Sequence, residues 1–394
     1  MILPIASCRK RKGVSRLSSV PSEREEGLDV VRPVLEPMSA AEIAALLQRF
    51  PAVGKFESIL SVSGRPYSAG TLVRTETRDV FVKKRTAQWR SKEDIEREHA
   101  LIAHLRSRGF STPAVLANEA GETVTAEGPW LYEVFERAEG EDVYRESHSW
   151  MPFAKAAHAY SAGRRLAEFH RAVQGFELPP AAPHRPMVAR FDLMRQPDLP
   201  AAIEAEAGKR PSLAAYLEGR PWRQRIERAY GPFHERIQPL LVDIPSSATH
   251  GDWHGNNLFF RGDEVVSVID FHLCDMTFRM YDLVVALDRN AVEWLAILDG
   301  QADAVRYDLI DAMLAGYQSV LPLSPVEKRL LPDLLAVHQL DLALSNIHYY
   351  LEVEQNIGRA HWAYEVYLLE HADYFHTDAG RRLLDAVASC LSGG

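Results

Sequence analysis

The stretch Thr249-His-Gly-Asp-Trp-His-Gly-Asn-Asn-Leu-Phe-Phe260 decides the fold of this 394-residue chain, because in it a polar loop passes directly into an apolar strand. The dipeptide Gly262-Asp263 then separates this strand from a second apolar run, Val265–Ile269. A Gly-Asp turn between two apolar runs predicts a β-hairpin. In such a hairpin Asn257 and Asp270 lie side by side at the open end.

The residue types in this hairpin suit phosphoryl transfer. That reaction needs a carboxylate that orients the attacking hydroxyl and accepts its proton, and oxygen ligands that hold Mg²⁺ against the phosphates. In protein kinases an Asp precedes the metal-binding Asn by five positions, as Asp252 precedes Asn257 here. Asp270-Phe271 stands where kinases carry Asp-Phe-Gly, with His272 in place of the glycine. The pattern therefore predicts a phosphotransfer site at the open end of the hairpin.

Length and composition narrow the class of protein. A chain of 394 residues exceeds what one hydrophobic core usually serves, so we expect two lobes. The net charge of −9 argues against nonspecific binding to nucleic acid or to membranes. Cys8, Cys274 and Cys390 lie too far apart for a disulfide framework or a zinc pattern, which favours a cytoplasmic protein.

Three regions follow one another along the chain. Residues 1–37 are rich in Ser, Arg and Glu and are predicted to be a disordered tail. Residues 38–137 have the patterns of a small antiparallel sheet interrupted by one helix, and residues 138–394 are predicted to be mainly helical. We therefore predict an α+β, bilobal, protein-kinase-like fold with an ATP-binding N-terminal lobe and a catalytic, substrate-binding C-terminal lobe.

The expected elements of the first lobe alternate between strands and turns. Ser39 with Glu42 three residues later predicts a capping box at the start of a short helix. The remaining predictions are strands over Phe56–Val62, Thr71–Thr77, Val80–Lys83, Ala114–Ala117, Glu122–Ala126 and Trp130–Phe135, a turn over Ser63–Gly70, and a helix over Ser91–Arg108.

In the second lobe the pattern is helical on both sides of the hairpin. A long amphipathic helix is predicted over Ala154–Val173. Further helical segments are predicted over 211–240, 282–298, 303–319, 325–354, 360–374 and 379–391.

The sequence resembles the aminoglycoside phosphotransferase/choline kinase superfamily. The likeness rests on His250-Gly-Asp-Trp-His-Gly-Asn-Asn257, Val268-Ile-Asp-Phe271, Tyr281-Asp-Leu283 and Leu166-Ala-Glu-Phe-His170, and it extends over about residues 50–375. Within the superfamily the chain is similar to bacterial homoserine-kinase-like and stress-response-kinase-like phosphotransferases.

The resemblance implies ATP and Mg²⁺ as cofactors and assigns roles to the hairpin residues. Asp252 would be the catalytic base, and Asn257 and Asp270 would be the Mg²⁺ ligands. His250 would brace the loop, and Asp282 would hold it by backbone hydrogen bonds. The alternative for Asp282 is a helix N-cap.

The first lobe is expected to supply a lysine for the phosphates and a glutamate that positions it. Because strand side chains alternate between faces, only one of Lys83 and Lys84 can face the cleft. Lys83 shares a face with Phe81 and is preferred. Its expected partner is Glu98, for which the alternative is a solvated helix face.

Two further nucleotide contacts are predicted where the last strand of the first lobe ends. The segment after Phe135 resembles the hinge that binds adenine through backbone groups, which suggests Glu136 and Ala138. The turn Ser63–Gly70 has only two glycines, so it gives weak evidence of phosphate binding.

The acceptor is the least determined part of the prediction. His348, Tyr349 and Glu352 lie in a polar and aromatic stretch that suits an amine-bearing ligand, although such a helix also packs in a core. His254 would contact the substrate or only shape the loop. We expect a small-molecule kinase acting on an amino alcohol, a hydroxyamino acid or an aminoglycoside-like antibiotic. The alternatives are a protein Ser/Thr kinase of the stress-response type and an ATP-binding regulatory pseudokinase, although a pure binder needs no base.

Overall fold

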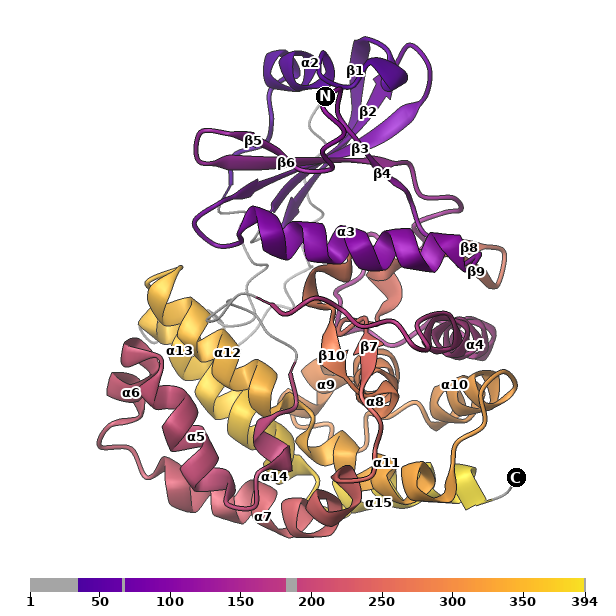
Figure 1. Cartoon of the computed structure of the whole chain (residues 1–394). Helices are drawn as coiled ribbons and strands as arrows, with labels where there is room; N and C mark the ends of the chain where they lie inside the picture. The colour runs from indigo at the N-terminus through magenta and orange to yellow at the C-terminus, as the bar shows by residue number, and fades with distance from the viewer. Residues whose placement is uncertain (1–34, 66–67, 182–189, 393–394) are drawn as a thin grey trace, which may run out of the picture.

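The computed structural model describes residues 35–65, 68–181 and 190–392, so most of the predicted tail lies outside the described residues. Its first region is an antiparallel sheet in the order β1-β2-β3-β6-β4, with β5 paired to β6. Helix α3 (Lys92–Ser107) lies below this sheet, between it and the helical region (Figure 1). The strands are β1 Phe56–Arg65, β2 Ser68–Thr75, β3 Asp79–Thr86, β4 Val115–Leu116, β5 Thr125–Glu127 and β6 Trp130–Glu136.

A small apolar core holds one face of the sheet. Val73, Val82 and Val134 are fully buried and pack with Ile43 of helix α2 (Ala40–Leu47). The predicted capping box at Ser39 is confirmed, since its side chain accepts from the Glu42 amide. The other face of the sheet, which carries Lys83, is thereby left toward the helical region.

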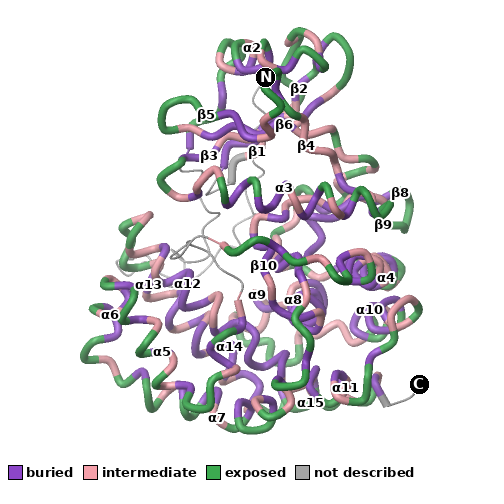
Figure 2. The backbone as a smooth tube through the Cα atoms, viewed as in Figure 1, coloured by how far each residue is buried: buried purple, intermediate pink, exposed green. Residues whose placement is uncertain are grey.

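The second region is mainly helical, so the predicted α+β class is confirmed. Buried backbone is concentrated where its helices face one another (Figure 2). The helices are α4 Ala156–Ala172, α5 Leu199–Gly208, α6 Pro211–Leu217, α7 Trp222–Leu241, α8 Arg279–Ala291, α9 Trp294–Leu298, α10 Tyr307–Gln318, α11 Pro325–Val337, α12 Gln339–Glu352, α13 Ile357–Trp362, a π-helix Ala363–Glu370, α14 His371–Tyr374 and α15 Asp378–Ser392.

The predicted hairpin is present as β8 (Leu258–Arg261) and β9 (Glu264–Val268). Its turn begins at Gly262, whose φ of 61° is unfavourable for other residues. Beyond the paired strands, the Ile269 amide donates to the Asn257 carbonyl at 3.0 Å. Asn257 and Asp270 therefore lie at the same end of the hairpin, as predicted.

Several predicted boundaries were wrong. The turn over Ser63–Gly70 is mostly strand, because β1 and β2 pair as far as Arg65 and Ser68. The helix predicted over 211–240 is two helices, separated where Gly219 adopts a φ of 74° and Pro221 follows. Helix α5 and the short strand pair β7 (Ser247–Thr249) and β10 (Asp275–Thr277) were missed.

Two glycines allow α4 and α10 to pack closely. A Cβ at Gly163 would overlap the Met313 carbonyl oxygen, and one at Gly316 would overlap the Tyr160 carbonyl oxygen. Each helix therefore places a glycine against the backbone of the other.

We predict that Gly163→Ala lowers the free energy of unfolding by about 1–3 kcal/mol, because the helices must separate to accommodate the methyl group. Gly208→Ala is the matched control: Gly208 is helical, exposed and faces open space, so this change raises stability by about 0.4–1 kcal/mol. Urea denaturation measures both. A Gly163→Ala variant as stable as the wild type would contradict the close packing.

Candidate active site

The loop before the hairpin is held by one buried carboxylate on α8. Asp282 Oδ2 accepts the His250 amide and Asp282 Oδ1 accepts the Gly251 amide, each at 2.7 Å. His170, from the predicted Leu166–His170 motif, places its Nε2 3.1 Å from Asp282 Oδ2. The N-cap of α8 is Phe278, so the N-cap alternative for Asp282 was wrong.

His250 ties this loop to the end of β9. Its Nδ1 accepts the Asp252 amide at 3.2 Å, so its other ring nitrogen carries the proton and donates to the Ile269 carbonyl at 3.0 Å. Gly251 between them has a φ of 80°, and a Cβ there would lie 2.6 Å from the Leu273 carbonyl oxygen. The backbone before Asp252 is thus fixed on three sides.

The Asp252 carboxylate lies at the centre of a polar cluster. Asn257 Nδ2 lies 3.1 Å from its Oδ2, and His254 Nε2 lies 3.2 Å from the same oxygen. Arg289 Nη1 lies 3.2 Å from Oδ1. Burial alone would raise the pKa of Asp252, but His254 and Arg289 outweigh it and hold the pKa well below its ordinary value. The carboxylate is therefore ionised and oriented at neutral pH.

Asp270 has a strained backbone for a residue other than glycine. Its φ of 64° and ψ of 65° place it in the left-handed region, a conformation that is concentrated at functional sites. Its Oδ1 lies 2.8 Å from Lys83 Nζ and 3.1 Å from His272 Nδ1. Burial would raise the pKa of Asp270, but Lys83 and His272 outweigh it and keep the pKa well below its ordinary value.

The donors at this end of the hairpin fit a magnesium ion. The Asn257 amide nitrogen is engaged with both the backbone and the side chain of Asp252, so its carbonyl oxygen is the group that it offers to a cation. Together with an ionised Asp270 it forms a hard oxygen donor set, which Mg²⁺ prefers.

The two candidate lysines lie on opposite faces of β3. Lys83 pairs with Asp270 and lines the same cavity as Asp252 and Asn257. Lys84 pairs with Glu42 at 2.7 Å and lies 4.2 Å from the centre of the Trp130 ring. The structure thus places Lys83 at the site and Lys84 against α2.

Glu98 is neither paired with Lys83 nor part of a solvated helix face, the two alternatives for this residue. Its carboxylate binds Arg85 at 3.2 Å and also Arg90, and no Lys83–Glu98 ion pair is present among the described residues. It is buried, so the solvated-face alternative was wrong. Burial would raise the pKa of Glu98, but the two guanidinium groups outweigh it and lower the pKa. Glu98 makes no ion pair with Lys83 because two buried arginines, Arg85 and Arg90, already bind its carboxylate.

The residues expected at the hinge lie outside the cavity lining. Glu136 donates its amide to the Ala114 carbonyl at 2.9 Å, and its carboxylate pairs with Arg78 at 3.6 Å and Arg106 at 3.5 Å. Ala138 follows β6 and is likewise absent from the lining. Adenine binding at Glu136 and Ala138 therefore stays a prediction.

A cavity of about 200 Å³ lies between the sheet and the helical region at this site. Its lining includes Lys83, Asp252, His254, Asn257 and Asp270. The lining also includes groups that suit recognition of a second molecule, contributed by Trp150, Arg289, Gln339, Asn346, Tyr350 and Tyr367. The predicted base and metal ligands thus share one cavity with an aromatic and amide-bearing wall.

The face of α12 that lines the cavity is not the one that the sequence prediction selected. The cavity face carries Gln339, Leu342, Asn346 and Tyr350, spaced by three or four residues, which is one stripe of a helix. His348, Tyr349 and Glu352 do not line the cavity: the first contacts the Ser212 hydroxyl at 3.2 Å, the second is buried and the third is exposed.

Two residues at the site were missed. Arg289 contacts Asp252 and donates its Nε to the Ser149 carbonyl at 3.0 Å. Asn290 accepts the Gly255 amide at 3.0 Å and donates to the Trp253 carbonyl at 2.9 Å. Both lie two helical turns after Asp282 on the same face of α8, which is the signal that could have found them.

The fold and the site define the class of this protein as a kinase-like phosphotransferase. A family model described as "Phosphotransferase enzyme family" matches residues 67–323, and the chain belongs to that family. The chain is 27% identical over 299 residues to a homoserine kinase of Agrobacterium fabrum (strain C58), covering 76% of this chain and 82% of that protein.

Solved structures share the fold. A microcompartment-associated aminopropanol kinase matches with a TM-score of 0.57 at 17% identity, covering 89% of this chain and all of that one. Amicoumacin kinase in complex with AMP-PNP, Ca²⁺ and Ami matches with a TM-score of 0.56 at 15% identity, covering 86% and 96% of the two chains. Within residues 35–65, 68–181 and 190–392, every helix is too short or too polar to span a bilayer.

We predict that Asp282→Asn loosens the loop, because the amide nitrogen of the new side chain cannot accept a backbone N–H. The buried donor left unpaired costs about 1–3 kcal/mol in the free energy of unfolding. Hydrogen exchange at the His250 and Gly251 amides is expected to accelerate. The exposed Asp299→Asn serves as the control and leaves exchange unchanged. Slow exchange at both amides in Asp282→Asn would contradict the role of this carboxylate.

Proposed function

We propose that this protein transfers the γ-phosphate of ATP to a hydroxyl group of a small molecule, with Asp252 as base. The observation that supports it most strongly is the convergence of Asp252, Asn257, Asp270 and Lys83 on one cavity. These are the residue types that phosphoryl transfer needs for orientation, metal binding and charge neutralisation.

In the proposed reaction Asp252 accepts a hydrogen bond from the acceptor hydroxyl and takes its proton as the new O–P bond forms. The bond between the β,γ-bridging oxygen and the γ-phosphorus breaks, and ADP leaves. The low pKa of Asp252 makes it a weak base, which suits a loose transition state in which orientation matters more than early proton removal. Arg289 and Asn257 hold the carboxylate in place.

Lys83, Asn257 and Asp270 are assigned to the nucleotide. Asn257 and Asp270 would hold Mg²⁺, which neutralises charge on the phosphate oxygens when bound. Lys83, whose ammonium lies 2.8 Å from the Asp270 carboxylate, would move from that contact to the phosphates. Glu98 would then affect Lys83 only by longer-range electrostatic attraction, as part of the buried Arg85–Glu98–Glu133 cluster.

For the acceptor, a hydroxyamino acid is favoured. The similarity to homoserine kinase extends over 82% of that relative. The lining beside Asp252 includes Trp150, Asn346 and Tyr350, whose aromatic and amide groups suit a small polar molecule, which favours it over the protein kinase alternative. The intact Asp252, Asn257 and Asp270 argue against a pseudokinase.

We predict that Asp252→Ala reduces phosphate transfer by a factor of about 10² to 10⁴, the usual contribution of a general base. ATP binding is expected to remain within a few-fold of wild type. The measurement is Mg²⁺-dependent ADP release across homoserine, aminopropanol, choline, aminoglycosides, macrolides and a generic protein substrate, with ATP and GTP as donors. An Asp252→Ala variant that turns over as fast as wild type would refute the assignment.

Lys83→Met and Lys84→Met form a matched pair. We predict that the first raises the KM for ATP and lowers kcat, because the phosphates lose their cation, whereas the second changes the KM for ATP less than twofold, since Lys84 faces Glu42 and Trp130. Steady-state kinetics at saturating acceptor measures both. Equal effects of the two changes would contradict the assignment of Lys83.

A further inference from the structure

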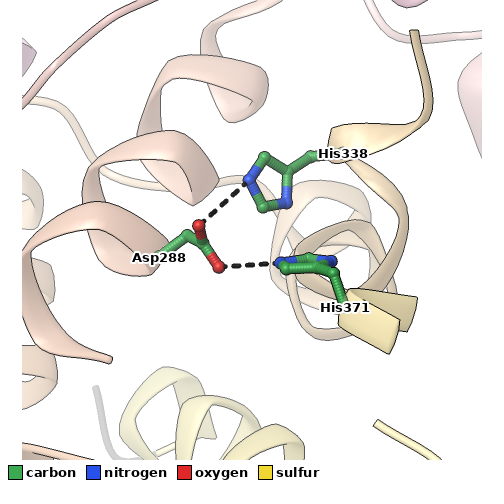
Figure 3. A group of neighbouring side chains, drawn as sticks. All are labelled: Asp288, His338 and His371. Carbon is green, nitrogen blue, oxygen red and sulfur yellow. Dashed lines mark hydrogen bonds and ion pairs between the residues drawn. The ribbon is translucent and has the colours of Figure 1, made fainter. Parts of the chain in front are cut away.

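A second cluster of metal-ligand side chains lies next to Gln339, one of the residues on the aromatic and amide-bearing wall of the cavity, which we call the acceptor wall. Asp288 on α8, His338 at the α11–α12 junction and His371 at the start of α14 direct their polar atoms toward one another (Figure 3). All three are buried, and one ligand atom from each lies within 4.8 Å of the others. The proposed phosphotransfer reaction uses none of them.

The tautomer of His338 singles out this cluster. Its Nδ1 lies 2.9 Å from the Leu335 carbonyl, and because a carbonyl only accepts, Nδ1 carries a proton. A neutral ring therefore directs the lone pair of Nε2 toward Asp288. This Nε2 is buried and has no hydrogen-bond partner, and its distance of 3.6 Å from Asp288 Oδ2 exceeds the roughly 2.7–2.9 Å of a charged hydrogen bond.

We propose that Asp288, His338 and His371 form a binding site for a divalent transition-metal ion, with Zn²⁺ as the best match. Two imidazoles and one carboxylate form a donor set that zinc accepts in proteins. Zinc–ligand bonds of about 2.0–2.2 Å in a tetrahedral shell separate neighbouring donor atoms by about 3.4 Å. Asp288 Oδ1 lies 3.0 Å from His371 Nε2, and Asp288 Oδ2 lies 3.6 Å from His338 Nε2, so the contacts of its two oxygens bracket that separation.

The surroundings of His338 and Asp288 match those of metal ligands. A proton on the far nitrogen of a ligating histidine usually binds a carbonyl or carboxylate, as His338 Nδ1 binds Leu335. Ligating carboxylates are also hydrogen-bonded, and Asp288 accepts from Trp294 Nε1 at 3.0 Å and Gln339 Nε2 at 3.4 Å. The bound ion would therefore be buried, and a water molecule or another donor would complete its tetrahedral shell.

Such an ion would connect three elements that build the acceptor wall. Asp288 precedes Arg289, which contacts Asp252, and Gln339 follows His338 and lines the cavity. His371 follows the π-helix that carries Tyr367, another lining residue. The site would fix α8, α12 and the π-helix relative to one another without touching the substrate.

The test is the metal content of the full-length chain, purified without a histidine tag or chelator from zinc-supplemented medium and measured by mass spectrometry. We expect about one zinc ion per chain, as the single donor set implies. After the metal is removed, Co²⁺ titration of the wild type should give the intense visible absorption of a four-coordinate, imidazole-bound ion. His338→Gln and Asp288→Asn should each lose most of the zinc and the absorption.

Two controls separate this cluster from other sites. His234→Gln removes a buried histidine whose Nε2 lies 2.9 Å from the Gln196 carbonyl, and it should retain the zinc. Asp270→Asn removes a proposed Mg²⁺ ligand and should also retain it. The proposal is overturned if the wild type holds no zinc and gives no cobalt absorption, because the cluster is then a hydrogen-bonded network with a protonated His338. It is equally overturned if Asp270→Asn loses the metal while His338→Gln keeps it.

Discussion

The site depends on one carboxylate that accepts two consecutive backbone amides. Asp282 receives the His250 and Gly251 N–H groups on separate oxygens, at 2.7 Å each, in a fully buried position. Hydrogen bonds to a charged group contribute about 1.5–3 kcal/mol each, so this pair is worth more than most contacts in the molecule. Because position 251 has a positive φ and lies against the Leu273 carbonyl, it admits only glycine, and the two hydrogen bonds to Asp282 then hold the backbone that carries Asp252.

Helix α8 connects the functions of the molecule. Asp282 fixes the loop before the proposed base, Asn290 fixes the loop after it, and Arg289 contacts the carboxylate of the proposed base. Between Asp282 and Arg289 in the chain, Asp288 points toward His338 and His371, the other residues of the proposed metal site (Figure 3). A single helix thereby connects the proposed reacting centre to the cavity lining that would select the acceptor. Most of that lining, including Gln339 and Tyr350, lies beyond residue 323, where the family match ends.

The sequence predicted which residues meet at the end of the hairpin because these residues are close together in the chain. The hairpin, its turn and the spacing of Asp252 and Asn257 all lie within one short stretch, so periodicity and turn chemistry could place them. Strand alternation likewise separated Lys83 from Lys84. The long amphipathic helix and the capping box at Ser39 were also predictable, because each depends on neighbours in the chain.

The rest depends on contacts between distant segments, which a single sequence does not encode in a readable way. The partners of Glu98 are Arg85 and Arg90, and these contacts exist only in the folded structure. The face of α12 that meets the cavity follows from how that helix packs, and its composition alone favoured the wrong stripe. Arg289 is nineteen or more residues from every residue of the predicted hairpin site except Asp282, so its contact with Asp252 became visible only in three dimensions.

A crystal structure of the protein with Mg²⁺ and a nonhydrolysable ATP analogue tests the central claim most directly, namely that the end of the hairpin is the reacting centre. The account predicts an ion bound by the Asn257 carbonyl oxygen and the Asp270 carboxylate, Lys83 turned from Asp270 to the phosphates, and the Asp252 carboxylate facing the γ-phosphate across space for an acceptor hydroxyl. Metal and phosphates bound away from Asn257 and Asp270, with Lys83 still paired to Asp270, would contradict it.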